Sequence, residues 1–228
     1  METGLSHRSF RESVMPVALA LAVCLREVVW SDRLDPFNHH PYFPVGVTTI
    51  WDTVPLYVAT PDDKRQERLI YQPKYKNCVF KFEVAVTFSM QIVYFSGPHL
   101  GTANDNDIFN QGTRLGQHVF EPYEYGLGDK IYQTAEHILA GHRNPPGGSI
   151  TDAQRDENDK LDFCRSSVER VFAALTDHRA FHSRPGFRGT LEALTAFAYI
   201  TIHVTAALFR HQPSRRPAKH GPWSHDWR

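Results

Sequence analysis

The chain has little cysteine and no excess of charge of either sign. Its 228 residues include 3 cysteines, which are widely spaced and form no C-x-x-C pair: Cys24, Cys78 and Cys164. This pattern excludes a disulfide framework and a cysteine-ligated zinc site, and it favours a reducing compartment. Because 25 basic residues balance 25 acidic residues, no global electrostatic field marks the protein as a nucleic-acid or membrane binder.

Long hydrophobic runs are also scarce. The run from Val14 to Leu25 is too short to span a bilayer, and the acidic residues Glu2 and Glu12 before it argue against a secretory signal. A second apolar segment, from Leu191 to Phe209, is interrupted by polar residues, namely Thr195, Thr201 and His203. We therefore expect two buried helices and no membrane partner.

Common catalytic motifs are missing as well. The chain has no G-x-S-x-G nucleophile elbow, and Gly126 and Gly128 lack the third glycine of a dinucleotide-binding loop. Two histidine pairs have no cysteine partners, so ordinary surface or core histidines are favoured over a zinc site; these pairs are His137 with His142 and His178 with His182.

Charge is unevenly distributed along the chain. Residues 176–228 hold eight basic and three acidic residues, so the rest of the chain is net acidic and is where a metal site is expected. Arginines in the second half could track a DNA backbone, and the candidates are Arg165, Arg170, Arg179 and Arg188. The proline-rich basic tail, residues 212–228, is predicted to be disordered, and it could equally serve only as a solubilising tail.

The first half of the chain predicts strands with loops between them. Residues 8–30 are expected to form a helix, residues 35–44 a loop, and the β-branched residues 45–58 a strand that carries Asp52 to its tip. Residues 62–68 are charged and are expected to form a solvated loop. Period-two alternation over residues 78–96 predicts an antiparallel hairpin with a turn near Ser89.

The second half predicts helices. A short helix is expected at 105–111, and a short strand over 123–132 that ends at Asp129. The Pro-Pro-Gly-Gly run within residues 143–149 permits only a loop. Thr151 and Gln154 form a capping-box pattern that opens a helix to about residue 178, and a core helix follows from Thr190 to about residue 211. These elements predict the α/β class, with a helical lead-in at 1–44, a domain at 45–211 and a tail at 212–228.

Three carboxylates stand out by position: Asp52 and Asp129 at strand ends, and Glu169 inside a helix. Two strands can bring the first pair together at one sheet edge, and a helix that crosses the sheet can present the third. Oxygen ligands of this kind suit Mg²⁺ or Mn²⁺. Each residue also has an ordinary alternative: a strand-end aspartate for Asp52, a turn or helix cap for Asp129, and a pair with Arg165 for Glu169.

An ordered series of segments resembles the catalytic domain of the PIF/Harbinger class of DDE transposases: VTTIWDTVPLYV, YQPKYKNCVFKFEVAVTF, FSGPHLGTANDNDIF, YGLGDKIY, HRNPPGGSITDAQRDEND and SSVERVFAALTDHRAF. The resemblance covers roughly residues 45–210. It implies a ribonuclease-H-like mixed sheet flanked by helices, and metal-dependent hydrolysis and strand transfer of DNA. By this resemblance Asp52, Asp129 and Glu169 are the catalytic triad that holds two divalent ions, and Asp105 is a further candidate metal ligand.

The resemblance also implies partners and a compartment. DNA is the expected substrate, a homo-oligomer the expected assembly and the nucleus the expected location. Because residues 1–44 show no helix-turn-helix, a separate DNA-binding partner protein is a further expectation. Two departures from the family pattern stand out: Thr53 follows Asp52 where many relatives have glycine, and Thr176 replaces a common lysine. The first leaves the aspartate intact. Thr176, together with the short segment before residue 45 and the neutral overall charge, motivates the alternative of a catalytically inactive, transposase-derived module that binds DNA or protein.

Overall fold

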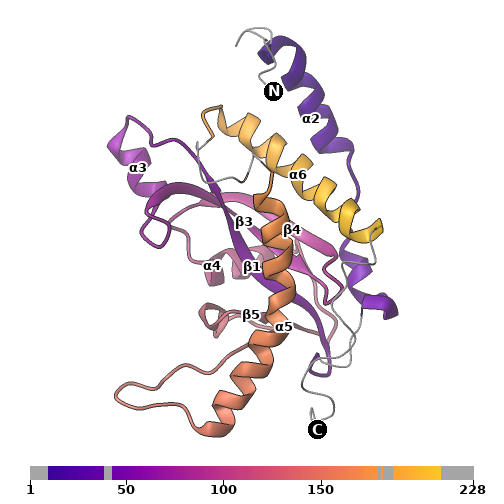
Figure 1. The fold of residues 1–228 in the computed structure, drawn as a ribbon, viewed down its shortest axis with the longest axis vertical. Helices are drawn as coiled ribbons and strands as arrows, with labels where there is room; N and C mark the ends of the chain where they lie inside the picture. The colour runs from indigo at the N-terminus through magenta and orange to yellow at the C-terminus, as the bar shows by residue number, and fades with distance from the viewer. Residues whose placement is uncertain (1–9, 39–42, 179–180, 182–186, 212–228) are drawn as a thin grey trace.

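The protein is described from a computed structural model, which covers residues 10–38, 43–178, 181 and 187–211. A mixed sheet forms its centre, with strands in the order β4-β3-β1-β5-β6 (Figure 1). Strand β3 pairs antiparallel with β1, and both β4 and the short β2 pair antiparallel with β3. Strand β5 runs parallel to β1, and β6 runs parallel to β5. The strands are β1 (Val47–Tyr57), β2 (Tyr71–Gln72), β3 (Asn77–Val86), β4 (Ile92–Leu100), β5 (Tyr125–Gly128) and β6 (Ile138–Ala140).

Helices cover both faces of this sheet. The long helices α5 (Asp152–Thr176) and α6 (Leu191–His211) share one apolar core with β1 and β3. On the other face, α4 (Asp105–Arg114) and the short turn η4 (Lys130–Tyr132) contribute to a second core around Trp51. The predicted α/β class with a ribonuclease-H-like mixed sheet flanked by helices is therefore confirmed.

The two long helices predicted in the second half of the chain agree closely with α5 and α6 of the structure. Thr151 and Gln154 form the capping box that starts α5. One stripe of α5 is buried, as its three-to-four-residue repeat predicts: Leu161, Cys164, Val168, Val171 and Leu175. Helix α6 is long and apolar enough to cross a membrane by length and composition, but side chains such as Leu194, Ile202 and Phe209 pack into the core.

Four predictions about local structure are wrong. The helix expected over 8–30 ends at Cys24, as η1 (Phe10–Val14) followed by α2 (Met15–Cys24). This helix is also not buried as predicted, because Ala18 is its one buried residue, while Val17, Leu21 and Val23 are exposed. Residues 25–29 are then extended or irregular, and two short turns follow, η2 (Trp30–Leu34) and η3 (Pro36–Asn38). The physical reason is tertiary: η2 packs against β4 and β1 and carries the buried Arg33.

The charged stretch 62–68 is helical instead of a loop. Helix α3 (Lys64–Ile70) begins after Asp63, whose carboxylate accepts a hydrogen bond from the backbone N–H of Arg65 at 2.8 Å. Such an N-cap satisfies a donor that would otherwise be exposed at the helix start.

The prediction that Asp52 lies at the tip of its strand is also wrong, because β1 continues five residues beyond it to Tyr57. The predicted disorder of 212–228 lies outside the described residues.

Candidate active site

Asp52 and Asp129 lie beside each other where the parallel pairing of β1 with β5 ends. In the register of these strands Trp51 is paired with Gly128, which is the last residue of β5. The residues that follow this pair in the two strands are Asp52 and Asp129. Although Asp52 is in the middle of β1 and pairs with Val84 of β3, it is therefore at the carboxyl end of the parallel pair, next to the position from which Asp129 leaves β5.

Backbone hydrogen bonds fix both carboxylates. The N–H of Thr53 donates to Oδ1 of Asp52 at 2.7 Å. Asp129 caps η4, and its Oδ1 accepts a hydrogen bond from the N–H of Lys130. The ordinary cap role expected as the alternative for Asp129 is thus present as well. One oxygen of each carboxylate is held by its own chain, so the side chains are oriented without a ligand.

Asp105 joins them from the other side of β1. It is the first residue of α4, next to the N-cap Asn104. Its Oδ1 accepts a hydrogen bond from Nζ of Lys81 at 2.8 Å. The pKa of Asp52 is raised from 3.8 to about 6, mainly by burial. The Thr53 hydrogen bond and the Arg165 charge oppose this increase, and the charges of Asp105 and Asp129 contribute to it. The three aspartates therefore interact electrostatically, as one carboxylate cluster.

Glu169 is not part of this cluster as the chain stands. It lies one helical turn after Arg165 on α5, and its side chain is exposed. Arg165 is the α5 residue that reaches the cluster, with Nη2 3.8 Å from Oδ2 of Asp52. Arg165 also pairs with Asp162 at 3.2 Å, so the Arg165–Glu169 pair considered as an alternative is not the contact that Arg165 makes.

Sequence reasoning missed a fourth carboxylate, Glu83 of β3. It lies opposite Thr53 of β1 and is completely buried. Burial raises its pKa from 4.5 to about 8, against a weak hydrogen bond from Ser96 at 3.4 Å, and Asp105 adds to the increase. Within the described residues its Oε1 has no hydrogen-bond partner. The available signal was that Lys81 and Glu83 alternate with apolar residues in a segment predicted to be a strand.

The remaining candidates lie elsewhere. Arg170 and Arg188 are exposed, and Arg179 lies outside the described residues, as does His182. His142 does not contact His137 as a metal-binding pair would; its Nε2 lies 2.8 Å from Oε2 of Glu157. The ring of His137 hydrogen-bonds the carbonyl group of Glu124 at 3.0 Å.

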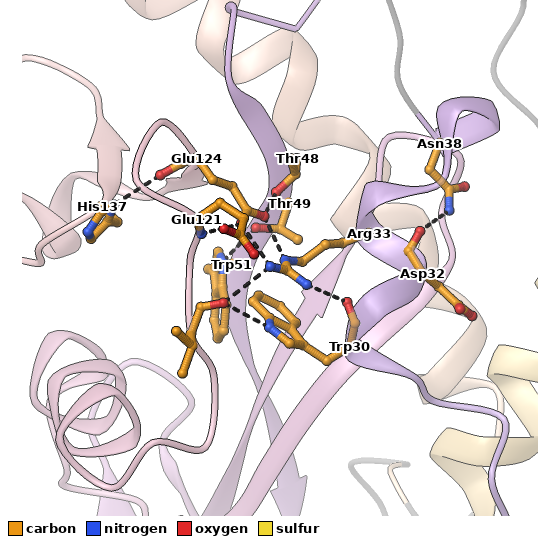
Figure 2. Close-up of polar contacts among 11 residues, drawn as sticks. Trp30, Asp32, Arg33, Asn38, Thr48, Thr49, Trp51, Glu121, Glu124 and His137 are labelled. Carbon is orange, nitrogen blue, oxygen red and sulfur yellow. Dashed lines mark hydrogen bonds and ion pairs between the residues drawn. The ribbon is translucent and has the colours of Figure 1, made fainter.

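A second buried charged group lies near the amino end of β1 (Figure 2). Nε of Arg33 donates to Glu124 at 2.6 Å, and its Nη2 donates to the other carboxylate oxygen at 2.9 Å. The hydroxyl group of Thr48 and the N–H of Glu121 also donate to this carboxylate. The guanidinium group lies 4.0 Å from the ring centroid of Trp30. Every oxygen of Glu124 is thus hydrogen-bonded, which is the arrangement of a structural ion pair.

The donor chemistry of the carboxylate cluster fits a hard divalent cation. Its side chains offer only oxygen, which is the ligand that Mg²⁺ and Mn²⁺ prefer. The pKa of Asp52 is raised, mainly by burial, so a bound cation would stabilise its ionised form. No group of three His, Cys, Asp or Glu side chains in the described part of the chain is already arranged to hold a metal ion. The chemistry of the donors therefore fits, while a complete coordination shell requires side chains to move.

A comparison with protein families bears directly on this site. Neither a curated protein nor a solved structure matches the chain. The family model described as DDE superfamily endonuclease matches residues 51–209, which begin one residue before Asp52 and include Asp105, Asp129 and Glu169. This match covers well over half of the chain, from the middle of β1 through the later strands of the sheet to α6. The chain therefore belongs to the DDE superfamily endonuclease family.

Proposed function

We propose that the protein is a metal-dependent DNA endonuclease of the transposase type, with Asp52, Asp129 and Glu169 as its catalytic carboxylates. Asp105 is a further candidate ligand. The observation that carries this proposal is the juxtaposition of Asp52 and Asp129 at the end of the β1–β5 pair, with the pKa of Asp52 raised to about 6. Two Mg²⁺ or Mn²⁺ ions are the proposed cofactors, and the Harbinger subtype is the proposed branch of the family.

Bound divalent ions would supply an activated water or 3′-hydroxyl group and neutralise the leaving oxygen of a phosphodiester. The chain's own contribution is to orient oxygen ligands. The Thr53 N–H holds one oxygen of Asp52, and the Lys130 N–H holds one oxygen of Asp129. Fixed ligands of this kind lower the cost of organising the site when DNA binds.

Completion of the triad requires a rearrangement on α5. Arg165 now occupies the side of Asp52 that faces this helix, at 3.8 Å, and its Nε is buried without a hydrogen-bond partner among the described residues. We propose that Arg165 turns toward a DNA phosphate, where a guanidinium group can bind two oxygens, and that Glu169 then approaches Asp52. Arg170 and Arg188, both exposed, are proposed to contact the DNA backbone, as is Arg179.

The proposed setting follows from the same reaction. Strand transfer at two DNA ends would be carried out by a homo-oligomer in the nucleus. A separate DNA-binding protein would supply sequence recognition, because base contacts specify a target and phosphate contacts do not.

The test is nicking of supercoiled plasmid DNA in Mn²⁺ by the full chain and by Asp52→Asn. We expect nicking to fall about 10²- to 10³-fold, as for loss of a group that stabilises a transition state. Because the raised pKa of Asp52 means that its ionised form is unfavourable in the folded state, the neutral variant should unfold at a temperature no lower than that of the native chain. Asp62→Asn, at an exposed position, is the matched control. Undiminished nicking by a folded Asp52→Asn protein would reject the proposal.

The second candidate function is a catalytically inactive module that binds DNA or protein. It is favoured by one observation, that no three carboxylates of the described residues form a ready metal site. This candidate predicts DNA binding whose affinity falls with salt, without any metal-dependent nicking. If the logarithm of the affinity for DNA did not change with the logarithm of the salt concentration, the hypothesis that this module binds DNA would be excluded.

A further inference from the structure

Lys81 is a buried lysine at the edge of the carboxylate cluster. It lies on β3, opposite Pro55 of β1 and His99 of β4, so its backbone is fixed by pairing on both sides. Only 7% of its side chain is exposed. Its ammonium group donates to Oδ1 of Asp105 at 2.8 Å and to the carbonyl oxygen of Ala103 at 2.8 Å. An ammonium group held this way acts as a fixed cation.

The partner of Lys81 is the electrostatic centre of the site. The negative charge of Asp105 raises the pKa of five groups around it: Asp52, Tyr75, Glu83, His99 and Tyr132. Asp105 thus lies within interaction range of both the catalytic candidate on β1 and the buried glutamate on β3. The cation that pairs with Asp105 therefore determines how much net negative charge the carboxylate cluster offers to a bound metal ion.

Among the residues that the structure describes, Arg165 and Lys81 each form an ion pair with an aspartate of the cluster, and they differ in how firmly they are held. The Arg165 guanidinium is 3.8 Å from Asp52, and 17% of its side chain is exposed. Lys81 makes a shorter contact, is more deeply buried and comes from a central strand. Arg165 is therefore the cation that can leave, and Lys81 is the cation that stays.

We propose that Lys81 is a positioning residue that permanently neutralises Asp105, so that divalent ions bind at Asp52 and Asp129 while Asp105 remains paired to the protein's own ammonium group. This inference rests on the proposed function and deepens it, because it decides which carboxylates are left for metal. It assigns Asp105 a structural partner in place of the ligand role that the family resemblance suggests.

A double-mutant cycle tests the pairing, with calorimetric titration of Mn²⁺ into the full-length chain. Lys81→Met leaves Asp105 without its ammonium partner. It should therefore increase the affinity for Mn²⁺ on the order of tenfold, the effect expected from one nearby charge, or allow a second ion to bind. Asp105→Asn leaves an unpaired ammonium group and should weaken binding by a similar factor. The double variant Lys81→Met/Asp105→Asn removes a neutral pair, so its affinity should return to within about threefold of the native value.

Two controls separate pairing from general charge and folding effects. Lys76→Met removes a lysine at an exposed position just before β3 and should leave the affinity for Mn²⁺ unchanged. Without metal, the pKa of His99 can be measured by NMR. Burial is the main cause of the lowered pKa of His99, which the Asp105 charge opposes and the Lys81 charge reinforces. Lys81→Met should therefore raise this pKa, and Lys81→Arg should restore the native value. If Lys81→Met does not fold, the double variant and Lys81→Arg complete the test, since both retain a balanced charge.

The outcomes separate this inference from the proposed function. If Mn²⁺ binding is lost in Asp52→Asn but Lys81→Met binds like the native chain, the role of Lys81 is overturned and the metal site stands. If neither the native chain nor Lys81→Met binds Mn²⁺, both are overturned. If Lys81→Met binds where the native chain does not, the inference is supported.

Discussion

Strand β1 passes two buried groups of charged side chains that are built in opposite ways. Near its amino end, burial alone would raise the pKa of Glu124, but hydrogen bonds from Arg33, Thr48 and Glu121 outweigh burial and lower it. At Asp52 the balance is reversed: burial outweighs the Thr53 hydrogen bond and the Arg165 charge, and the pKa rises to about 6. The first group is electrostatically satisfied, and the second is not.

This difference separates a structural role from a functional one. A saturated ion pair contributes to the stability of the fold and leaves nothing for a ligand to satisfy (Figure 2). A cluster with under-compensated carboxylates costs stability without a ligand, and such groups concentrate at sites that bind one. The buried Glu83, with one oxygen unpaired in the described structure, places a further cost at the same site.

Removal of one partner from the satisfied pair should have the largest effect on stability. Arg33→Met leaves Glu124 buried without its cation, and 4% of each side chain is exposed. We expect the free energy of unfolding to fall by about 4 kcal/mol, the usual cost of breaking a buried pair. Urea denaturation measures it, with the exposed Arg170→Met as the control. A loss below about 1 kcal/mol would show that the two regions do not differ as described.

The unsatisfied region should reveal itself through pH. The native state keeps a proton on Glu83 up to about pH 8, whereas the unfolded chain releases it near pH 4.5. Native protein therefore binds more protons in this range, and its stability must fall as pH rises. The expected loss is about 3 kcal/mol between about pH 5 and pH 8. Glu83→Gln cannot ionise and should remove this part of the pH dependence in urea titrations.

The matched comparison for this prediction is Glu124→Gln. Because the pKa of Glu124 is lowered, its contribution to stability is complete above the pKa of the unfolded chain and is lost as the solution becomes more acidic. The two variants should therefore change the pH profile in opposite directions. If Glu83→Gln leaves the profile between pH 5 and pH 8 unchanged, the buried carboxyl group is ionised throughout and the comparison fails.

Much of the scaffold was predictable from local patterns. The capping box at Thr151, the apolar stripe of α5 and the period-two hairpin of β3 and β4 each follow from nearest neighbours in the chain. The position of Asp52 was predicted only in part: the parallel pairing with β5 ends at Trp51, just before Asp52, while β1 itself continues to Tyr57.

The parts that sequence could not supply depend on contacts between distant residues. After the first helix, the turn η2 carries Arg33, whose buried partner Glu124 is 91 positions away in the chain. The burial of Lys81 and Glu83 requires α4 and η4 to cover a strand face that is polar in sequence. The charged residues 64–70 form a helix because Asp63 caps it, and a count of charges does not show a cap. The roles of Glu169 and the arginines stay predictions.

The smallest effect should come from an exposed ion pair with nearly the same geometry as the buried one. Arg155 and Asp152 approach to 2.7 Å, against 2.6 Å for Arg33 and Glu124, but 56% and 94% of their side chains are exposed. Water solvates both charges whether or not they meet, so Asp152→Asn should cost about 0.5 kcal/mol or less. Part of that cost is loss of a negative charge at the start of α5. Urea denaturation at low and high salt measures it, because salt screens an exposed pair and leaves the Arg33–Glu124 pair almost unchanged. A cost close to that of Arg33→Met would mean that contact distance, and not burial, decides what an ion pair contributes in this fold.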